Sequence, residues 1–144
     1  MTYQIKNTDI ETWFNGWNSH DVAIAQELFA DDVVIYEPLV PEPLKGKAGL
    51  AGFFAPLFKT YPDIHFEPEY RIVQGNEAVS FEIVTGTMTG RGRNAAGQEI
   101  EPTGKSFNIK GAIRIRYNDT GKINLVAIYW DRYLLFQQLG LLTA

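Results

Sequence analysis

A strict two-residue alternation in the second half of the chain constrains the fold more than any other feature. Most even positions between residues 106 and 116 are polar or charged. Four odd positions of the same run are apolar: Phe107, Ile109, Ile113 and Ile115. Because successive side chains of a β-strand point to opposite faces, this run predicts a strand with one buried face. A second odd-numbered series predicts another such strand: Ile123, Leu125, Ala127 and Tyr129.

Helical spacing characterises the first part of the chain. The first apolar positions fall at i, i+3, i+4 and i+7, which is one face of a helix: Ile10, Trp13, Phe14 and Trp17. Further helices are predicted from Val22 to Phe29 and from Leu50 to Phe58, and Pro56 should kink or split the latter. Residues 33–36, 64–72 and 79–87 are predicted strands, with an edge or a bulge at Pro68.

This order of elements predicts the fold class. Helices come first, then a run of antiparallel strands, then an apolar tail from Tyr133 to Leu139 that is expected to be a short helix. Segregation of helices from strands argues for an α+β fold, and the length of 144 residues fits one domain over residues 1–144.

Composition excludes several classes of function. The net charge of −4 makes nonspecific binding to nucleic acid or to an anionic membrane unfavourable. The chain contains no cysteine, which excludes disulfides, thiolate metal sites and a thiol nucleophile. No apolar run approaches the roughly 18 residues of a membrane helix, and the first residues lack the apolar core of a secretion signal. We therefore expect a cytoplasmic protein.

Motifs for metals and nucleotides are missing or incomplete. The two histidines, His20 and His65, lie in different predicted elements and have no paired spacing. Gly104–Ser106 resembles the end of a phosphate loop, but Glu99 stands where the first glycine of that motif is required. We expect neither a metal nor a cofactor.

An aromatic surplus and one carboxylate point to a pocket. The side chains expected to line it, or to form core, are Trp13, Trp17, Tyr36, Phe53, Phe54, Ile109 and Tyr129. Asp131 continues the odd series of its strand, and on the buried face its pKa would be raised, which suits acid–base chemistry. Equally, Asp131 fits the cap of the C-terminal helix. Glu82 has the even parity of its strand and is expected to face away from the pocket.

Several short motifs together resemble the SnoaL-like polyketide cyclases over nearly the whole chain. They are Trp17–Asp21, Tyr61–Asp63, Gly86–Gly90, Glu101–Lys105, Tyr129–Asp131 and Gln137–Gly140. The resemblance implies a cone in which a curved antiparallel sheet wraps around the N-terminal helices and encloses an apolar pocket. Scytalone dehydratase, ketosteroid isomerase and limonene epoxide hydrolase share this architecture.

The resemblance also implies an activity. Cyclases of this family close a ring by intramolecular aldol condensation, without cofactor or metal, and an aspartate near the end of the last strand is the general acid/base. The matching position is Asp131. The family commonly forms homodimers through the outer face of the sheet. Met88 is a departure, because relatives often carry histidine in that segment.

Three hypotheses follow. The first is a cofactor-independent cyclase or isomerase that acts on a carbonyl-rich apolar molecule through Asp131. The second is a small-molecule binding protein that uses the same pocket without chemistry. The third is an epoxide hydrolase, whose chemistry in this fold needs an arginine between two pocket carboxylates; Arg114 and Arg116 have the wrong parity for that role.

Overall fold

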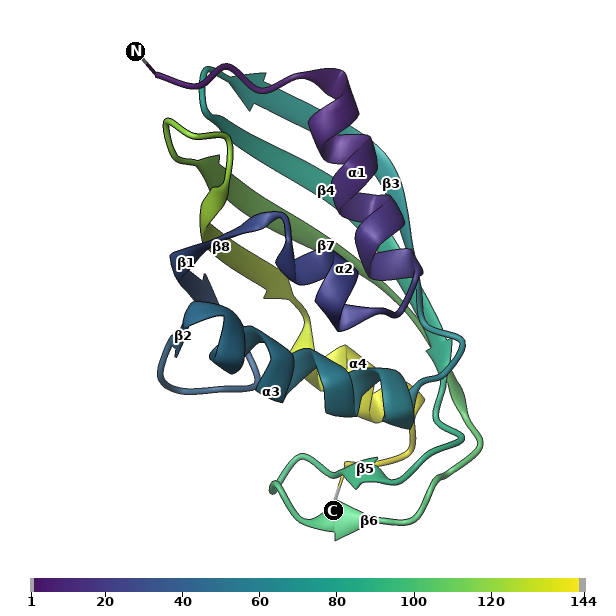
Figure 1. Cartoon of the computed structure of the whole chain (residues 1–144). Coiled ribbons are helices and arrows are strands. Elements are labelled where there is room, and N and C mark those ends of the chain that lie inside the picture. The colour runs from purple at the N-terminus through teal and green to yellow at the C-terminus, as the bar shows by residue number, and fades with distance from the viewer. Residues whose placement is uncertain (1, 143–144) are drawn as a thin grey trace.

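The fold consists of helices packed on one face of a curved sheet (Figure 1). The structure, a computed structural model, describes residues 2–142, apart from the side chains of residues 24 and 25. The helices are α1 (Asn7–Asn18), α2 (Val22–Gln26), α3 (Gly46–Thr60) and α4 (Arg132–Gln138). The strands are β1 (Phe29–Tyr36), β2 (Leu44–Lys45), β3 (His65–Gln74), β4 (Glu77–Thr87), β5 (Gly92–Arg93), β6 (Glu99–Ile100), β7 (Ser106–Tyr117) and β8 (Ile123–Trp130).

Six strands form the main sheet in the order β2-β1-β8-β7-β4-β3. All neighbours pair antiparallel except β1 and β8, which are parallel, so the sheet is mixed rather than purely antiparallel. Strands β5 and β6 form a separate hairpin beyond the end of α3 (Figure 1). The predicted α+β class and cone-like architecture are confirmed.

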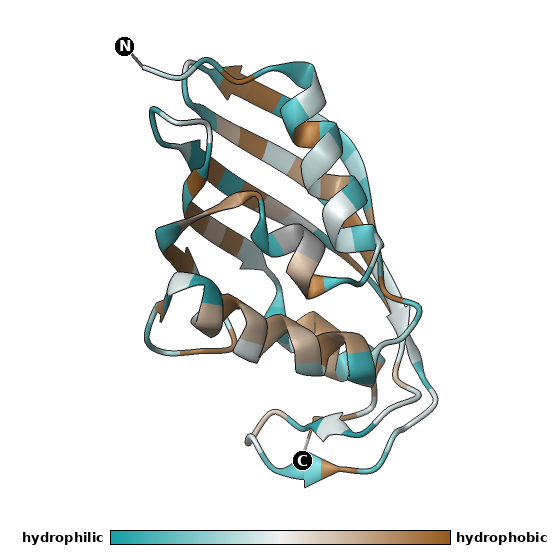
Figure 2. Ribbon diagram, in the orientation of Figure 1, coloured by the Kyte–Doolittle hydropathy of each residue, from teal (hydrophilic) through white to brown (hydrophobic). Residues whose placement is uncertain are grey.

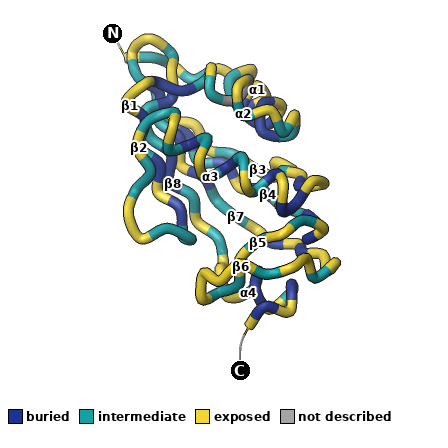
Figure 3. The backbone as a smooth tube through the Cα atoms, turned by 60° about the horizontal axis from the view of Figure 1, so that its bottom comes forward, coloured by how far each residue is buried: buried dark blue, intermediate teal, exposed yellow. Residues whose placement is uncertain are grey.

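The core lies between the helices and the inner face of the sheet. Helix α1 buries the four residues that its spacing predicted, and β7 buries its odd apolar positions. Hydrophobic residues concentrate in β1, β8 and α3 (Figure 2). Buried positions alternate with exposed ones along α1 and α3 (Figure 3). Helix α3 continues past Pro56 to Thr60, so the proline does not split it.

Two bulges reverse the predicted orientation of side chains. In β8, Ile123 pairs with Tyr117 whereas Leu125 pairs with Arg116, so one extra residue separates them. The even residues that follow then face inward, and Tyr129 faces outward. In β3, the register shifts between Pro68 and Tyr70, as the proline predicted, and Tyr70 becomes exposed. An inserted residue shifts the two-residue period by one, which moves every later side chain to the other face.

Strand β4 also faces opposite to its prediction. The odd residues carry the apolar side chains that suggested burial, yet the even residues lie inside. The physical reason is the pairing with β7: Val84 stands opposite Ile109, and Glu82 stands opposite Gly111. Directly opposed residues of an antiparallel pair share a face, so the buried face of β7 fixes that of β4. The expectation that Glu82 faces away is therefore wrong.

Candidate functional site

A cavity of about 750 Å³ lies between the inner face of the sheet, helices α1, α3 and α4, and the β5–β6 hairpin. This volume is typical of a site for a small organic molecule. Its lining is mainly apolar and aromatic, with contributions from Trp13, Trp17, Phe53, Phe54, Phe107 and Trp130.

The structure brings together five of the eight residues that the sequence proposed for the site. Trp13, Trp17, Phe53, Phe54 and Ile109 line the cavity. Tyr36 and Tyr129 do not line it. They lie on the outside of the sheet, where Tyr36 is 50% exposed and Tyr129 is 62% exposed. Tyr36 alternates with the buried Ile35, and the bulge in β8 turns Tyr129 outward. Neither tyrosine is placed to contact a ligand in this cavity.

Asp131 lies at the beginning of helix α4, not among the residues that line the cavity. Its side chain is exposed, and its Oδ1 accepts a hydrogen bond of 3.0 Å from the Leu134 N–H. Strand β8 ends at Trp130, so the alternation does not extend to Asp131. The helix-cap interpretation of Asp131 is confirmed.

Glu82 is the most deeply buried carboxyl that lines the cavity, with 3% of its surface exposed. Burial raises the pKa of Glu82 to about 8, because the charged form loses its hydration without a compensating cation. Its Oε2 has no hydrogen-bond partner among the described residues. Its neighbour across the strand pair is Gly111, and a Cβ at that position would lie in ordinary contact with Glu82 Oε1, at 3.8 Å.

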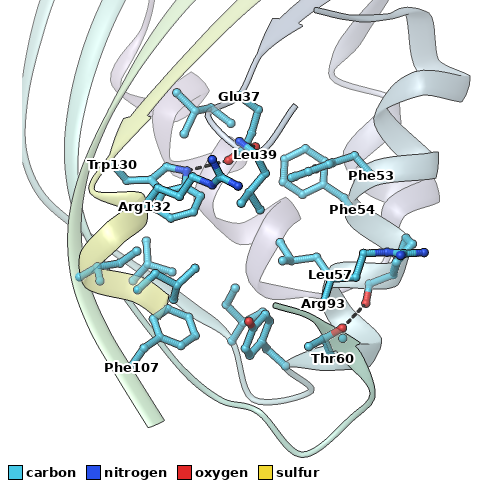
Figure 4. Close-up of a pocket in the computed structure, with 18 of the residues that line it drawn as sticks. Glu37, Leu39, Phe53, Phe54, Leu57, Thr60, Arg93, Phe107, Trp130 and Arg132 are labelled. Atoms are coloured by element: carbon cyan, nitrogen blue, oxygen red, sulfur yellow. Dashed lines mark hydrogen bonds between the residues drawn. The ribbon is translucent and has the colours of Figure 1, made fainter. Parts of the chain in front are cut away.

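Glu37 is the second buried carboxyl of the cavity, with a different environment. Its Oε2 accepts a hydrogen bond of 2.6 Å from the Leu39 N–H, and its Oε1 accepts one of 2.6 Å from Trp130 Nε1 (Figure 4). Burial raises the pKa of Glu37, but both hydrogen bonds and the positive charge of Arg132 act in the opposite direction. Burial is the largest of these influences, so the pKa of Glu37 is raised overall, but Glu37 has two hydrogen-bond donors whereas Oε2 of Glu82 has none among the described residues.

One further polar atom of the lining has no partner. Trp17 Nε1 is buried and unbonded among the described residues, so its N–H is a donor without an acceptor. A buried donor left unpaired costs free energy, which a ligand oxygen would recover. The mainly apolar lining thus includes two residues with a buried, unpartnered polar atom, Trp17 and Glu82, and a third, Glu37, whose carboxyl is hydrogen-bonded.

The residues considered for metals have structural partners instead. A ring nitrogen of His20 lies 2.6 Å from the Ile64 carbonyl oxygen, and His65 is bonded to Glu67 at 3.0 Å. Within residues 2–142, no group of three or more metal-binding side chains converges.

Met88 is fully buried, and Thr103 Oγ1 lies 3.8 Å from its sulfur. In the described part of the chain, no helix is long and apolar enough to cross a membrane.

Sequence reasoning missed Glu37 and Glu82. Glu37 follows the last residue of β1 and carried no motif. Glu82 is one of two polar residues, with Ser80, among the even positions from 78 to 84 of β4. The odd positions of the same stretch are apolar, so parity within the strand pointed the wrong way. The signal that identifies Glu82 is its register against Gly111, which only the paired sheet provides.

Comparison with known proteins identifies the family. The model of the SnoaL-like domain matches residues 10–126, which is more than half of the chain. The chain has no significant match among curated proteins.

Solved structures agree with this family in their fold. A SnoaL-like polyketide cyclase candidate from Jannaschia sp. CCS1 has a TM-score of 0.78 and 18% identity, with 96% of each chain covered. IdmH, a polyketide cyclase candidate from Streptomyces antibioticus, has a TM-score of 0.75 and 22% identity, covering 92% of this chain and 96% of its own.

A third structure extends the comparison beyond cyclases. A hypothetical protein from Catenulispora acidiphila DSM 44928, with a ketosteroid isomerase-like fold and bound trimethylamine, has a TM-score of 0.77 and 15% identity over 96% of each chain. At these identities the structural likeness establishes the fold. Together with the match of the domain model, it shows that the chain belongs to the SnoaL-like family and adopts the ketosteroid isomerase-like α+β cone.

Proposed function

We propose that this protein is a cofactor-independent acid–base enzyme that cyclises or isomerises an apolar carbonyl compound. The observation that carries the proposal is the pair Glu37 and Glu82, two buried carboxyls in one cavity with opposite hydrogen bonding. Environments that separate the pKa values of two carboxyls assign one as the acid and the other as the base.

Glu82 is the acid of the pair. With a pKa of about 8 it is protonated at neutral pH, so its O–H donates to the carbonyl oxygen of the substrate. The N–H of Trp17 supplies a second donor for an oxygen atom in the same cavity. Such donors stabilise the negative charge that develops on oxygen when a neighbouring carbon loses its proton.

Glu37 is the base of the pair. Its carboxylate takes the proton from the carbon next to the carbonyl, and the electrons of the broken C–H bond move to the carbonyl oxygen, which receives the proton of Glu82. In a cyclisation the resulting enol attacks a second carbonyl, the new alkoxide takes the proton from Glu37, and the enol O–H returns its proton to Glu82. In an isomerisation another carbon takes the proton from Glu37, with the same return of the enol proton to Glu82. Each carboxylate oxygen of Glu37 retains a lone pair beyond its present hydrogen bond.

The test is deuterium uptake from D₂O by β-keto esters, followed by mass spectrometry. We expect wild type to exchange the activated C–H above background, with a rate that declines as the pH rises through about 8 and Glu82 ionises. Glu82→Gln should reduce exchange by roughly 10²-fold or more. Asp131→Asn is the matched control, since asparagine is also a favoured helix cap and the position lies outside the cavity.

The result also decides on Asp131, which the family resemblance proposed as the acid/base. Loss of exchange in Asp131→Asn with retention in Glu82→Gln would transfer the role to Asp131. Absence of exchange in wild type with every surrogate would contradict the enzyme and favour the second candidate, a binding protein. The unpaired Trp17 N–H supports that candidate as well, because it binds an oxygen without chemistry. A binding protein without catalytic activity should keep its affinity for the ligand in Glu82→Gln.

The epoxide hydrolase hypothesis has less support. Arg132 is the arginine whose charge acts on Glu37, but it has no ion pair with Glu37 or Glu82 in the described part of the chain.

We also propose, from the sequence, that the protein is cytoplasmic and forms a homodimer. The dimer is supported by a row of exposed aromatic side chains on the outside of the sheet, which include Tyr70, Phe81 and Tyr129.

A further inference from the structure

Positive charge gathers at the cavity although the whole chain carries a net charge of −4. The cationic side chains that line it are Lys59, Arg91, Arg93 and Arg132. The carboxyls that line it are Glu37, Glu82 and Glu99, and Glu82 is neutral at pH 7. The lining therefore carries a positive excess at neutral pH, opposite in sign to the rest of the protein.

The cations differ in how they are compensated. Arg91 forms ion pairs of 3.3 Å with Glu99 and 3.0 Å with Glu101, so its charge is neutralised within the hairpin. Arg93 and Arg132 have no carboxylate at ion-pair distance among the described residues. Both arginines stand beside the cavity in Figure 4. Neither arginine therefore forms an ion pair in the described part of the chain, although the charge of Arg132 acts on Glu37.

Main-chain oxygens of the hairpin hold these two guanidinium groups. Arg93 Nη1 donates to the Gly97 carbonyl at 2.8 Å, and Arg132 Nη2 donates to the Ala95 carbonyl at 3.1 Å. Arg132 also lies over the ring of Phe136, with its Cζ 5.7 Å from the ring centroid. A guanidinium carries several further N–H donors, which stay available for an anion.

The hairpin that carries Arg93 is fastened to helix α3. The Gly90 N–H donates to the Thr60 carbonyl at 3.0 Å, and Thr60 Oγ1 donates to the Arg91 carbonyl at 2.8 Å. Gly90 packs so closely on Lys59 that a Cβ there would overlap the Lys59 carbonyl oxygen. The unpaired cations are therefore fixed relative to the cavity rather than carried on a free loop.

We propose that the substrate of this cavity carries a carboxylate, which Arg93 and Arg132 bind while the carbonyl end of the molecule reaches Glu82. This inference rests on the proposed function, and it narrows the substrate class to apolar keto acids. Charge-assisted hydrogen bonds to a guanidinium are stronger than neutral ones and suit a planar carboxylate. They also orient the molecule, since its charged end cannot lie in the apolar part of the cavity.

The test compares an acid with its methyl ester: 5-(2-naphthyl)-5-oxopentanoate and the uncharged methyl 5-(2-naphthyl)-5-oxopentanoate. Binding is measured by titration calorimetry and by the fluorescence of the cavity tryptophans. We expect wild type to bind the acid at least about tenfold more tightly than the ester at low ionic strength, with a smaller ratio in high salt. In the double variant Arg93→Gln/Arg132→Gln the ratio should fall to near one.

Arg71→Gln is the control for the loss of one positive charge, to be compared with Arg93→Gln and Arg132→Gln singly, because Arg71 lies on β3 and does not line the cavity. It should keep the preference for the acid. Equal affinity of wild type for acid and ester, or no binding of either, overturns the inference, as does a double variant that keeps the preference. The deuterium-exchange test uses neutral esters, so exchange at Glu82 with equal binding of acid and ester would overturn the carboxylate site alone.

Discussion

Adjacent residues of strands β4, β7 and β8 form two rows across the sheet, one on its inner face and one on its outer face. The two rows differ from what their burial would suggest, because the inner row contains a carboxyl and the outer row contains aromatic rings. The inner row is Glu82, Gly111 and Trp130, and the outer row, which continues to β3, is Tyr70, Phe81, Ala112 and Tyr129. Glu82 is 3% exposed and the adjacent Phe81 is 39% exposed. The strand thus buries its carboxyl and leaves its aromatic ring partly in solvent.

This arrangement is the reverse of what stability alone would select. Full burial of a phenylalanine side chain stabilises a fold by about 1.5–3 kcal/mol, whereas an unpaired buried carboxyl is destabilising. Reversal on both faces of the same strand indicates that each face serves an interaction beyond folding. The inner row contributes Glu82 and Trp130 to the cavity, and the outer row leaves aromatic surface in solvent, which the proposed dimer would cover.

The largest expected effect is the pH dependence that Glu82 imposes on stability. Its pKa in the folded protein, about 8, exceeds the ordinary value of 4.5, so the folded state binds this proton more strongly than the unfolded state. The stabilisation is complete below about pH 4.5 and is lost as the pH rises through about 8. At about 1.4 kcal/mol per pKa unit, the loss is on the order of 5 kcal/mol.

Urea unfolding of wild type and Glu82→Gln between pH 5 and pH 9 measures this effect. Glutamine resembles the protonated acid in size and charge, so the variant should match wild type at pH 5 and exceed it at pH 9. The difference between the two curves isolates Glu82 from the other titrating groups. Parallel curves would show that Glu82 ionises in the folded state as it does in water.

A smaller effect is expected from the hydrogen bond between Trp130 and Glu37. Trp130→Phe removes the N–H that Oε1 of Glu37 accepts, which should destabilise the fold by roughly 1.5–3 kcal/mol. It should also raise the pKa of Glu37 and move the acidic limb of the exchange reaction to higher pH, because a donor to the charged form is lost.

Trp17→Phe is the matched control for Trp130→Phe. Trp17 lines the same cavity, but its Nε1 has no partner within residues 2–142, so this variant loses ring area without breaking a described hydrogen bond. It should leave the acidic limb unchanged. If both variants shifted the limb equally, the hydrogen bond to Glu37 would not be the cause.

Local patterns of the sequence predicted much of the fold. The spacing of Ile10, Trp13, Phe14 and Trp17 predicted the buried face of α1, and the alternation in β7 predicted its buried face. Both patterns are complete within one element, and a single periodicity relates all their residues. They therefore needed no knowledge of which strands pair.

The candidate site was harder to predict because it depends on pairing. One inserted residue in β8 turned Tyr129 outward, and apolar residues at both parities of β4 concealed Glu82. The end of β8 at Trp130 made Asp131 a helix cap. A bulge, a register and a strand end are properties of two or more segments together, so hydropathy along one segment does not contain them.

The smallest effect on folding is expected in the outer row, where the proposed dimer makes its own prediction. Tyr70 and Tyr129 stand at the two ends of this row, and more than half of each side chain is exposed. The double variant Tyr70→Thr/Tyr129→Thr should change the free energy of unfolding of the monomer by only about 0.5 kcal/mol, since threonine also favours strands. It should weaken dimerisation by at least roughly tenfold, as loss of central aromatic residues does at other interfaces.

Light scattering after size-exclusion chromatography, over a range of protein concentrations, measures the change. Tyr133→Thr, at an equally exposed tyrosine on α4, is the control that should leave the oligomeric state unchanged. A wild type that is monomeric at every concentration would assign the exposed aromatic row to another partner.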